Sequence, residues 1–222
     1  MEEDQIILID KPAGISSFGV VAKVRAKLKN EFGHKVKVGH TGTLDPFATG
    51  LLILLSGKMT KKSDEFLRHD KVYEATLKLG FTSTTGDPEG EISKTINTPS
   101  ANHPKKSDIS SVVSSFIGKI TQTPPRFSAI KINGERAYKL ARKGENFEIP
   151  SREVEIYSID ILNYDYPELT IRCHVSSGTY IRTLAEDIGK KLGTGAYLTA
   201  LRRIKIADYD VKDASSLNDY ML

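Results

Sequence analysis

Apolar and polar residues alternate along two segments of this chain, and this pattern constrains the fold more than any other feature. The first segment runs from Tyr73 to Leu79 and the second from Leu169 to Val175. A period of two is typical of strands that bury one face. The uninterrupted apolar run Leu51–Leu55 indicates another strand, short enough to be fully buried. The chain therefore contains a sheet, and Tyr73 is predicted to point to its apolar side.

Helices interrupt the strands in an irregular order. Helical spacing of apolar residues predicts helices that start after Ser16 or Ser17, at a cap on Asp108, and at Gly178-Thr179. Further strands are expected at 5–10, 127–132 and 154–161, and further helices at 63–68 and 136–143. Because the regular β-α-β rhythm of a doubly wound sheet is missing, we expect an α+β fold with a mixed, mostly antiparallel sheet flanked by helices. With 222 residues, the chain is expected to form a single domain, 1–222.

Positive charge is concentrated in three parts of the sequence. Residues 11–80, 126–143 and 178–205 carry net charges of +7, +5 and +4, whereas the whole chain carries only +4. If folding brings these segments to one face, that face will attract a polyanion such as RNA. A scattered, solvated distribution of the same charges is the alternative.

Several classes of protein are not indicated by the sequence. The single cysteine, Cys173, cannot form an internal disulfide, and the acidic start of the chain does not resemble a secretion signal. We expect a cytoplasmic protein without a membrane span. The surroundings of His40 lack the spacing of a metal site, and no phosphate-binding or dinucleotide-binding glycine motif is present. No metal and no cofactor are predicted.

Two segments could carry chemistry. Gly39–Gly50 is a glycine-rich loop in which Pro46 restrains Asp45, so that the loop could present one carboxylate rigidly. An ordinary turn residue is the alternative for Asp45. Arg182 lies at the start of a predicted helix, where the helix dipole disfavours a cation. This position indicates either a functional arginine or a salt bridge to Glu186, four residues later.

Five sequence blocks and one triplet together resemble the TruB family of bacterial pseudouridine synthases. The blocks are Asp10–Ser17, Gly39–Pro46, Tyr73 with Leu79-Gly80 and Thr85-Gly86-Asp87, Gln122–Ala129, and Gly178–Ala185; the triplet is Leu201-Arg202-Arg203. They occur in the family's order and span residues 10–203.

The resemblance implies a pseudouridine synthase catalytic fold and the isomerisation of the T-loop uridine of tRNA, at position 55, to pseudouridine. It implies that Asp45 is the catalytic aspartate, that Tyr73 stacks on the target base and that Arg182 pairs with Asp45. It also implies that His40 lies against the displaced nucleotide and that Tyr180 and Leu201 line the uracil pocket. Many members carry a C-terminal PUA domain, which we expect this chain to lack.

The expected partner is the T stem-loop of tRNA, from which the uridine must be extruded before a carboxylate can reach its ribose. No protein partner is expected, and the protein is expected to be a monomer. Eight basic residues are candidates for contacts with RNA phosphates: Lys11, Lys23, Lys27, Arg126, Arg136, Arg142, Arg202 and Arg203.

Three other functions are weighed against this one. The guide-RNA-dependent branch of the family works with partner proteins, and the chain shows no added domain or basic tail for them. A non-catalytic chaperone of the T arm would not need Asp45, Tyr73 and Arg182. A glycoside or nucleoside hydrolase commonly uses two carboxylates. Asp87 is the one candidate for the second carboxylate, and its position in Gly-Asp-Pro indicates a turn.

Overall fold

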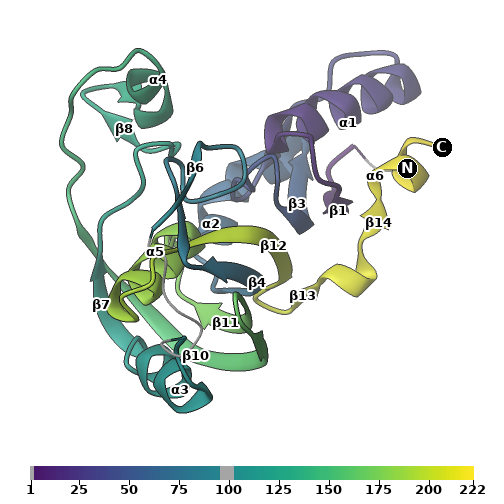
Figure 1. The fold of residues 1–222 in the computed structure, drawn as a ribbon. Coiled ribbons are helices and arrows are strands. Elements are labelled where there is room, and N and C mark those ends of the chain that lie inside the picture. The colour runs from purple at the N-terminus through teal and green to yellow at the C-terminus, as the bar shows by residue number, and fades with distance from the viewer. Residues whose placement is uncertain (1–2, 96–102) are drawn as a thin grey trace. The chain divides into compact units, whose positions relative to one another are not determined.

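The fold is described from a computed structural model, which covers residues 3–95 and 103–222 (Figure 1). Its contacts divide the chain into two compact units. The first unit comprises Met1–Tyr73 and Leu201–Leu222, and the second comprises Glu74–Ala200. Two strands, β4 (Lys71–Leu79) and β12 (Ala196–Ile206), run from one unit into the other. Each unit is described by itself below.

The first unit is built around three strands and one long helix. Its elements are β1 (Ile6–Lys11), α1 (Ser17–Phe32), β2 (Val38–His40), β3 (Thr49–Ser56), a 3-10 helix (Gly57–Lys62), α2 (Ser63–Leu67), β13 (Tyr209–Asp210), a second 3-10 helix (Val211–Asp213), β14 (Ser215–Ser216) and α6 (Leu217–Met221). β1 and β2 pair antiparallel with β3, and the end of β12 pairs parallel with it.

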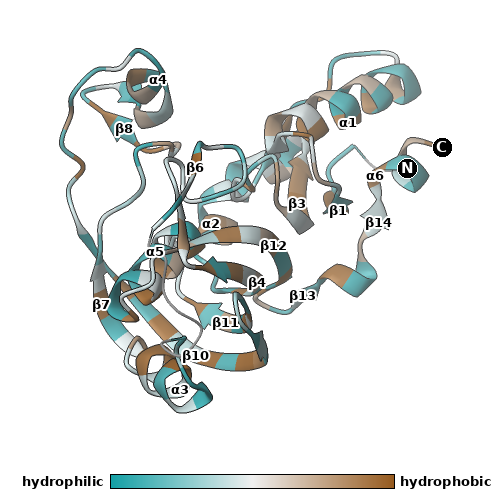
Figure 2. Cartoon of the chain, viewed as in Figure 1, coloured by the Kyte–Doolittle hydropathy of each residue, from teal (hydrophilic) through white to brown (hydrophobic). Residues whose placement is uncertain are grey.

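Both faces of β3 are buried. Leu52 and Leu54 pack in one cluster with apolar residues of α1, while Leu51, Ile53 and Leu55 pack in another cluster with Phe66. Figure 2 shows the apolar colour along this strand. The fully buried strand predicted from the run Leu51–Leu55 is confirmed. The predicted helix after Ser16 is also confirmed, since the Ser16 side chain accepts a hydrogen bond from the N–H of Gly19.

The second unit contains longer strands and the helix α5 (Ile181–Lys191). Its elements are the end of β4, β5 (Phe81–Ser83), β6 (Ile92–Lys94), α3 (Lys106–Ser114), β7 (Gly118–Gln122), β8 (Lys131–Ile132), β9 (Glu135–Arg136), α4 (Ala137–Arg142), β10 (Arg152–Asp165), β11 (Glu168–Val175), α5 (Ile181–Lys191) and the start of β12. β10 pairs antiparallel with β11 and, at its beginning, with β7. β8 and α4 lie in the segment between β7 and β10, residues 123–151. This segment, called the excursion, extends away from β10 and β11 (Figure 1).

The strands form a mixed sheet in the order β14-β1-β3-β12-β4-β11-β10-β7. The pairs β1–β14 and β3–β12 are parallel, whereas β1–β3, β10–β11 and β7–β10 are antiparallel. The α+β class with a mostly antiparallel sheet is therefore confirmed. The alternation of Tyr73–Leu79 is confirmed as well, because Tyr73 is buried in β4.

Three predicted boundaries are wrong, each for a local reason. The helix expected at Asp108 begins at Lys106, because the Asp108 carboxylate accepts the N–H of Lys105 at 2.8 Å from inside the first turn. The strand expected at 127–132 is reduced to β8, because the carbonyls of Ser128 and Ile130 accept the N–H groups of Tyr138 and Ala137 instead. The helix expected to start at Gly178-Thr179 begins at Ile181, because Tyr180 has an extended backbone and is the N-cap of α5.

Candidate active site

The loop between β2 and β3 carries Asp45, which is half-buried. In the preceding residue, Leu44, the backbone N–H and the backbone carbonyl both bond to one buried hydroxyl, that of Ser17. The Ser17 hydroxyl accepts a hydrogen bond from the N–H of Leu44 at 2.7 Å and donates one to the Leu44 carbonyl at 2.9 Å. The N–H of Ala48 then bonds to the carbonyl of Asp45 at 3.1 Å and closes a turn. Asp45 is therefore presented by a loop with a fixed backbone.

The following neighbour, Pro46, is anchored by Lys11. The Lys11 ammonium donates hydrogen bonds to the carbonyls of Pro12, Ile15 and Pro46 at 2.9, 2.8 and 3.2 Å, and the N–H of Gly14 donates to the Pro46 carbonyl at 2.9 Å. Lys11 is 0% exposed. The prediction that Lys11 contacts an RNA phosphate is corrected, because its charge is buried among backbone carbonyls.

Arg203 holds the beginning of the same loop from β12. Its guanidinium donates to the carbonyls of Leu51 and Gly42 at 2.8 and 3.1 Å, and the residue is only 1% exposed. Its backbone lies beside Gly50, where a Cβ would come within 2.3 Å of the Arg203 carbonyl oxygen. The predicted phosphate contact of Arg203 is therefore also corrected. The fold uses this arginine to connect β12 to the loop of Asp45.

Four further predicted residues of the first unit lie on its strands. His40 ends β2, is half-buried, and its Nδ1 accepts the N–H of Gly42 at 3.4 Å. Tyr73 is buried in β4, and Leu201 is buried in β12. Arg202 pairs with Asp10 at 2.7 Å, so its charge is already matched by a carboxylate.

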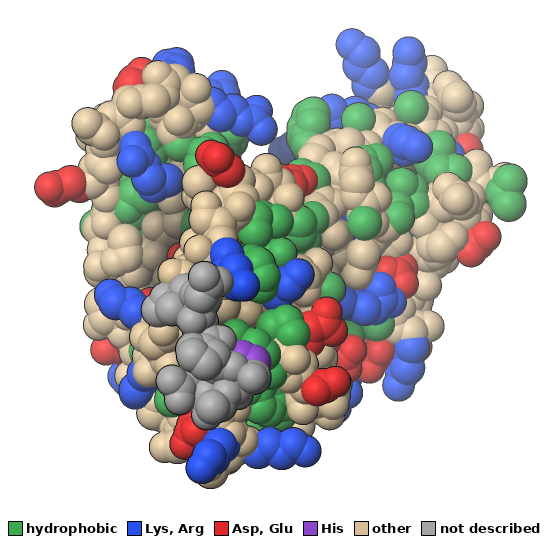
Figure 3. Space-filling view, viewed as in Figure 1, with side chains coloured by type: hydrophobic (Ala, Val, Ile, Leu, Met, Phe, Trp, Pro, Cys, Tyr) green, Lys and Arg blue, Asp and Glu red, His purple; other side chains and the backbone are tan. Residues whose placement is uncertain are grey.

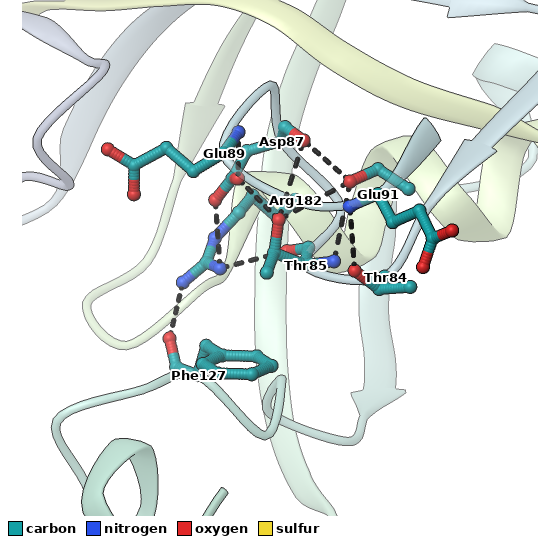
Figure 4. Close-up of polar contacts among 8 residues, drawn as sticks. Thr84, Thr85, Asp87, Glu89, Glu91, Phe127 and Arg182 are labelled. Atoms are coloured by element: carbon teal, nitrogen blue, oxygen red, sulfur yellow. Dashed lines mark hydrogen bonds and ion pairs between the residues drawn. The ribbon is translucent and has the colours of Figure 1, made fainter. Parts of the chain in front are cut away.

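The second unit contains Arg182, in the first turn of α5 and 4% exposed (Figure 4). Its Nη1 donates to the Thr85 carbonyl at 2.9 Å and to the Asp87 carboxylate at 3.1 Å. Its Nη2 donates to the Phe127 carbonyl at 2.7 Å. Asp87 is itself 2% exposed and accepts the hydroxyl of Thr85. The guanidinium is thus fixed by a buried ion pair and by two backbone carbonyls.

This ion pair changes the interpretation of Asp87. From its sequence setting the residue was predicted to be a turn residue, and it does lie in a turn, since the N–H of Gly90 bonds to its carbonyl. Its carboxylate, however, is the partner of Arg182, 95 residues away. Glu186 is the partner of Arg182 that the helix spacing predicts. Burial raises the pKa of Glu186, and the charge of Arg182 opposes this effect.

The remaining predicted residues lie on the surface or at helix ends. Tyr180 is half-buried at the N-cap of α5. Arg126, Arg136 and Arg142 are exposed in the excursion between β7 and β10, where Figure 3 shows Lys and Arg side chains over α4. Lys23 is exposed on α1, and Lys27 pairs with Glu31 at 3.1 Å.

Across residues 3–95 and 103–222, no group of three or more His, Cys, Asp or Glu side chains is arranged to hold a metal ion. Nor does any helix within these ranges have the length and apolar character needed to cross a membrane.

Family models match nearly the whole chain. One, described as TruB family pseudouridylate synthase (N terminal domain), matches residues 27–181. Another, described as tRNA pseudouridylate synthase B C-terminal domain, matches residues 182–221. The tRNA pseudouridine synthase B of Flavobacterium johnsoniae is 47% identical over 96% of this chain and 92% of its own length. That of Aquifex aeolicus is 45% identical over 98% of this chain and 74% of its own length.

Solved structures show the same fold. A chain from a Cbf5-Nop10-Gar1 complex superposes with a TM-score of 0.73 at 29% identity, covering 99% of this chain, which spans 54% of that chain. A pseudouridylate synthase superposes with a TM-score of 0.51 at 16% identity and supports the fold alone. The fold and the matching family models therefore define a pseudouridine synthase. Within that class, the chain belongs to the TruB family.

Proposed function

We propose that this enzyme converts the T-loop uridine of tRNA, at position 55, to pseudouridine, with Asp45 as the catalytic carboxylate. The relatives named tRNA pseudouridine synthase B support the tRNA substrate. The observation that carries the catalytic assignment is the anchoring of Leu44 and Pro46, since it holds the backbone on both sides of Asp45. A carboxylate presented on a fixed backbone loses little freedom when substrate binds.

The reaction needs a nucleophile or charge stabiliser but no oxidant and no energy source. The bond between N1 of uracil and C1′ of the ribose breaks, the freed uracil turns, and a bond forms between C5 and C1′. The proton on C5 then leaves and N1 gains one. Asp45, as a carboxylate, can attack C1′ or stabilise positive charge there during loss of the base.

We propose that Arg182 pairs with the Asp45 carboxylate during the reaction. A guanidinium carries five N–H donors, so Arg182 can bond to Asp87 and to a second carboxylate at the same time. Pairing with a guanidinium keeps a carboxylate ionised. The ion pair with Asp87 fixes the guanidinium for this task.

The base is held by apolar and aromatic side chains. Tyr73 stacks on the uracil, and an aromatic face tolerates a base that turns. Tyr180 and Leu201 line the uracil pocket, and His40 occupies the space that the extruded nucleotide leaves. The exposed Lys23, Arg126, Arg136 and Arg142, with Lys27 and Arg202, remain the candidates for phosphate contacts.

We further propose that the enzyme acts on free tRNA in the cytoplasm, as a monomer and without a protein partner. Light scattering of the purified protein with and without a tRNA transcript tests this part. A one-to-one complex is expected, and a stable dimer would contradict it.

The activity itself is tested with an unmodified T-arm stem-loop that carries tritium at C5 of its uridines. Tritium release by the purified protein is expected, and a stem-loop with cytidine at position 55 should release none. Tight binding without release would instead favour the chaperone, and free uracil in solution would favour the hydrolase.

A further inference from the structure

Gln122, the first residue of the block Gln122–Ala129, has no role in the mechanism above, yet it is among the most buried polar side chains of the second unit. Gln122 ends β7 and is 1% exposed. Its side-chain amide bonds to both backbone groups of Tyr180, 58 residues later in the chain. The N–H of Tyr180 donates to Oε1 at 2.8 Å, and Nε2 donates to the Tyr180 carbonyl at 3.0 Å.

This pairing acts where α5 begins. Tyr180 is the N-cap of the helix, and its side chain forms no capping hydrogen bond. Its carbonyl also accepts the N–H of Leu184 at 3.1 Å, in the first turn of the helix. A primary amide offers a donor and an acceptor side by side, as a neighbouring strand would. Gln122 therefore determines the position of the residue from which α5, and Arg182 with it, starts.

The residues that follow Gln122 continue along the same turn of the helix. The Thr183 hydroxyl donates to the carbonyl of Thr123 at 3.4 Å, and Arg182 donates to the carbonyl of Phe127 at 2.7 Å. One segment, Gln122–Phe127, thus bonds to Tyr180, the N-cap of α5, and to two residues of the helix's first turn, Arg182 and Thr183. It also overlaps the start of the excursion, which carries Arg126, Arg136 and Arg142.

Arg152 contacts the aromatic ring of Tyr180. The guanidinium carbon lies 4.9 Å from the centre of the Tyr180 ring, a cation–π arrangement, and the guanidinium also donates to the carbonyl of Gly178. The backbone of Tyr180 is therefore set by Gln122 and its ring by Arg152.

We infer that Gln122 is a positioning residue for pseudouridine formation, which acts by holding the start of α5 so that Tyr180 and Arg182 meet the uridine correctly. This inference rests on the proposed function. We expect substitution of Gln122 to lower the rate of the chemical step more than the affinity for RNA, because phosphate contacts supply most of the binding to RNA.

The first test compares Gln122→Met with the wild type in single-turnover tritium release from the T-arm stem-loop. Methionine keeps the length of the side chain and removes both hydrogen bonds. We expect the rate at saturating enzyme to fall at least about tenfold while the Kd for the stem-loop changes less than about threefold. Tyr164→Phe is the matched control. It removes a partly buried hydrogen bond to the Pro104 carbonyl in the same unit, and its rate should equal that of the wild type.

The second test uses Gln122→Glu and a pH series. When protonated, the introduced carboxyl group can accept the N–H of Tyr180 and donate to its carbonyl, as the amide does. When ionised, it has no proton to donate. Because burial raises the pKa of a carboxyl group, the rate of Gln122→Glu relative to the wild type should rise at least several-fold as the pH falls from about 8 to about 6. A purely structural role would lower stability without this pH dependence.

The results of these tests distinguish the proposed function from the proposed role of Gln122. If the wild type releases no tritium, the proposed function fails and this inference fails with it. If the wild type is active and folded Gln122→Met reacts at the wild-type rate, the inference alone is overturned. A relative rate of Gln122→Glu that is constant with pH would overturn it as well, even where Gln122→Met does not fold.

Discussion

At the scale of single residues, charged side chains in this enzyme are used to fix backbone as much as to meet RNA. Lys11 and Arg203 are buried, and both donate hydrogen bonds to carbonyls of the segments around Asp45. Asp87 is buried too, and it compensates the charge of Arg182. A buried charge is costly unless other groups replace its hydration, so each of these residues needs its partners.

Asp87→Asn should therefore destabilise the protein and slow the reaction. Both side chains of the ion pair are less than 5% exposed, and removing one charge from such a pair costs about 3–5 kcal/mol. Urea unfolding measures the stability, and tritium release measures the rate. Glu74→Gln is the control, because its ion pair with Arg172 is exposed and should contribute less than about 1 kcal/mol. Equal losses for the two variants would show that burial does not decide the effect.

From the sequence alone, a role could be proposed for a residue only where a motif carries it. Asp45 and Arg182 stand in recognisable blocks. The roles of Lys11, Arg203 and Asp87 were not predicted, because their partners are backbone carbonyls or a residue 95 positions away. Neither kind of partner leaves a local pattern in the sequence.

At the scale of elements, strands with a clear period were predicted and the strand β12 was not. Tyr73–Leu79 and Leu169–Val175 alternate because each buries one face. β12 begins with three consecutive buried residues, Ala196–Leu198, and later includes the buried Arg203, so no simple period remains. Its place between β3 and β4 is determined by tertiary pairing, which the sequence of the strand alone does not show.

The pairing of β3 with β12 depends on one glycine. Gly50 has a φ of 103°, and a Cβ there would lie 2.3 Å from the carbonyl oxygen and 2.7 Å from the nitrogen of Arg203. Gly50→Ala should cost more than about 3 kcal/mol, because it forces two backbones apart and strains φ. Gly33→Ala, at a φ of 75° with open space around the glycine, should cost only about 1 kcal/mol. Chemical denaturation compares them, and similar midpoints would contradict the close contact.

The link between α2 and β4 is expected to make the stability of the protein depend on pH. Lys71 donates to the carbonyls of Leu67 and His69, and burial, with the nearby charge of Arg203, lowers its pKa from 10.5 to about 8. Between these two values the unfolded chain binds more protons than the folded one, so the free energy of unfolding should rise with pH. Below pH 8 both states are protonated and this contribution is constant.

Lys71→Met should remove that rise, which amounts to at most about 3 kcal/mol. Urea unfolding of both proteins at about pH 7.5 and about pH 9.5 provides the measurement. If wild type and variant change in parallel between the two pH values, the lowered pKa of Lys71 is contradicted.

At the scale of the whole molecule, the uneven charge of the sequence predicts salt-dependent RNA binding. Residues 126–143 carry a net charge of +5, and the structure exposes Arg126, Arg136 and Arg142 in this segment. Each phosphate contact that is lost should reduce the slope of log affinity against log salt by about one.

Arg142→Gln should therefore weaken binding of the T-arm stem-loop and lower this slope by about one. Lys119→Gln serves as the control, because Lys119 lies on β7, outside the basic segment, and pairs with Glu153 at 3.3 Å. Fluorescence anisotropy over a salt series gives both slopes. An unchanged slope for Arg142→Gln would remove this arginine from the RNA interface.

The central claim, that the carboxylate of Asp45 performs the chemistry, is tested most directly by Asp45→Asn in single-turnover tritium release from the T-arm stem-loop. The amide keeps the size of the side chain and removes its charge. We predict that the rate falls more than about a thousandfold, or about 4 kcal/mol, while the Kd for the stem-loop stays within about threefold. A variant that binds RNA normally and releases tritium at the wild-type rate would contradict the account.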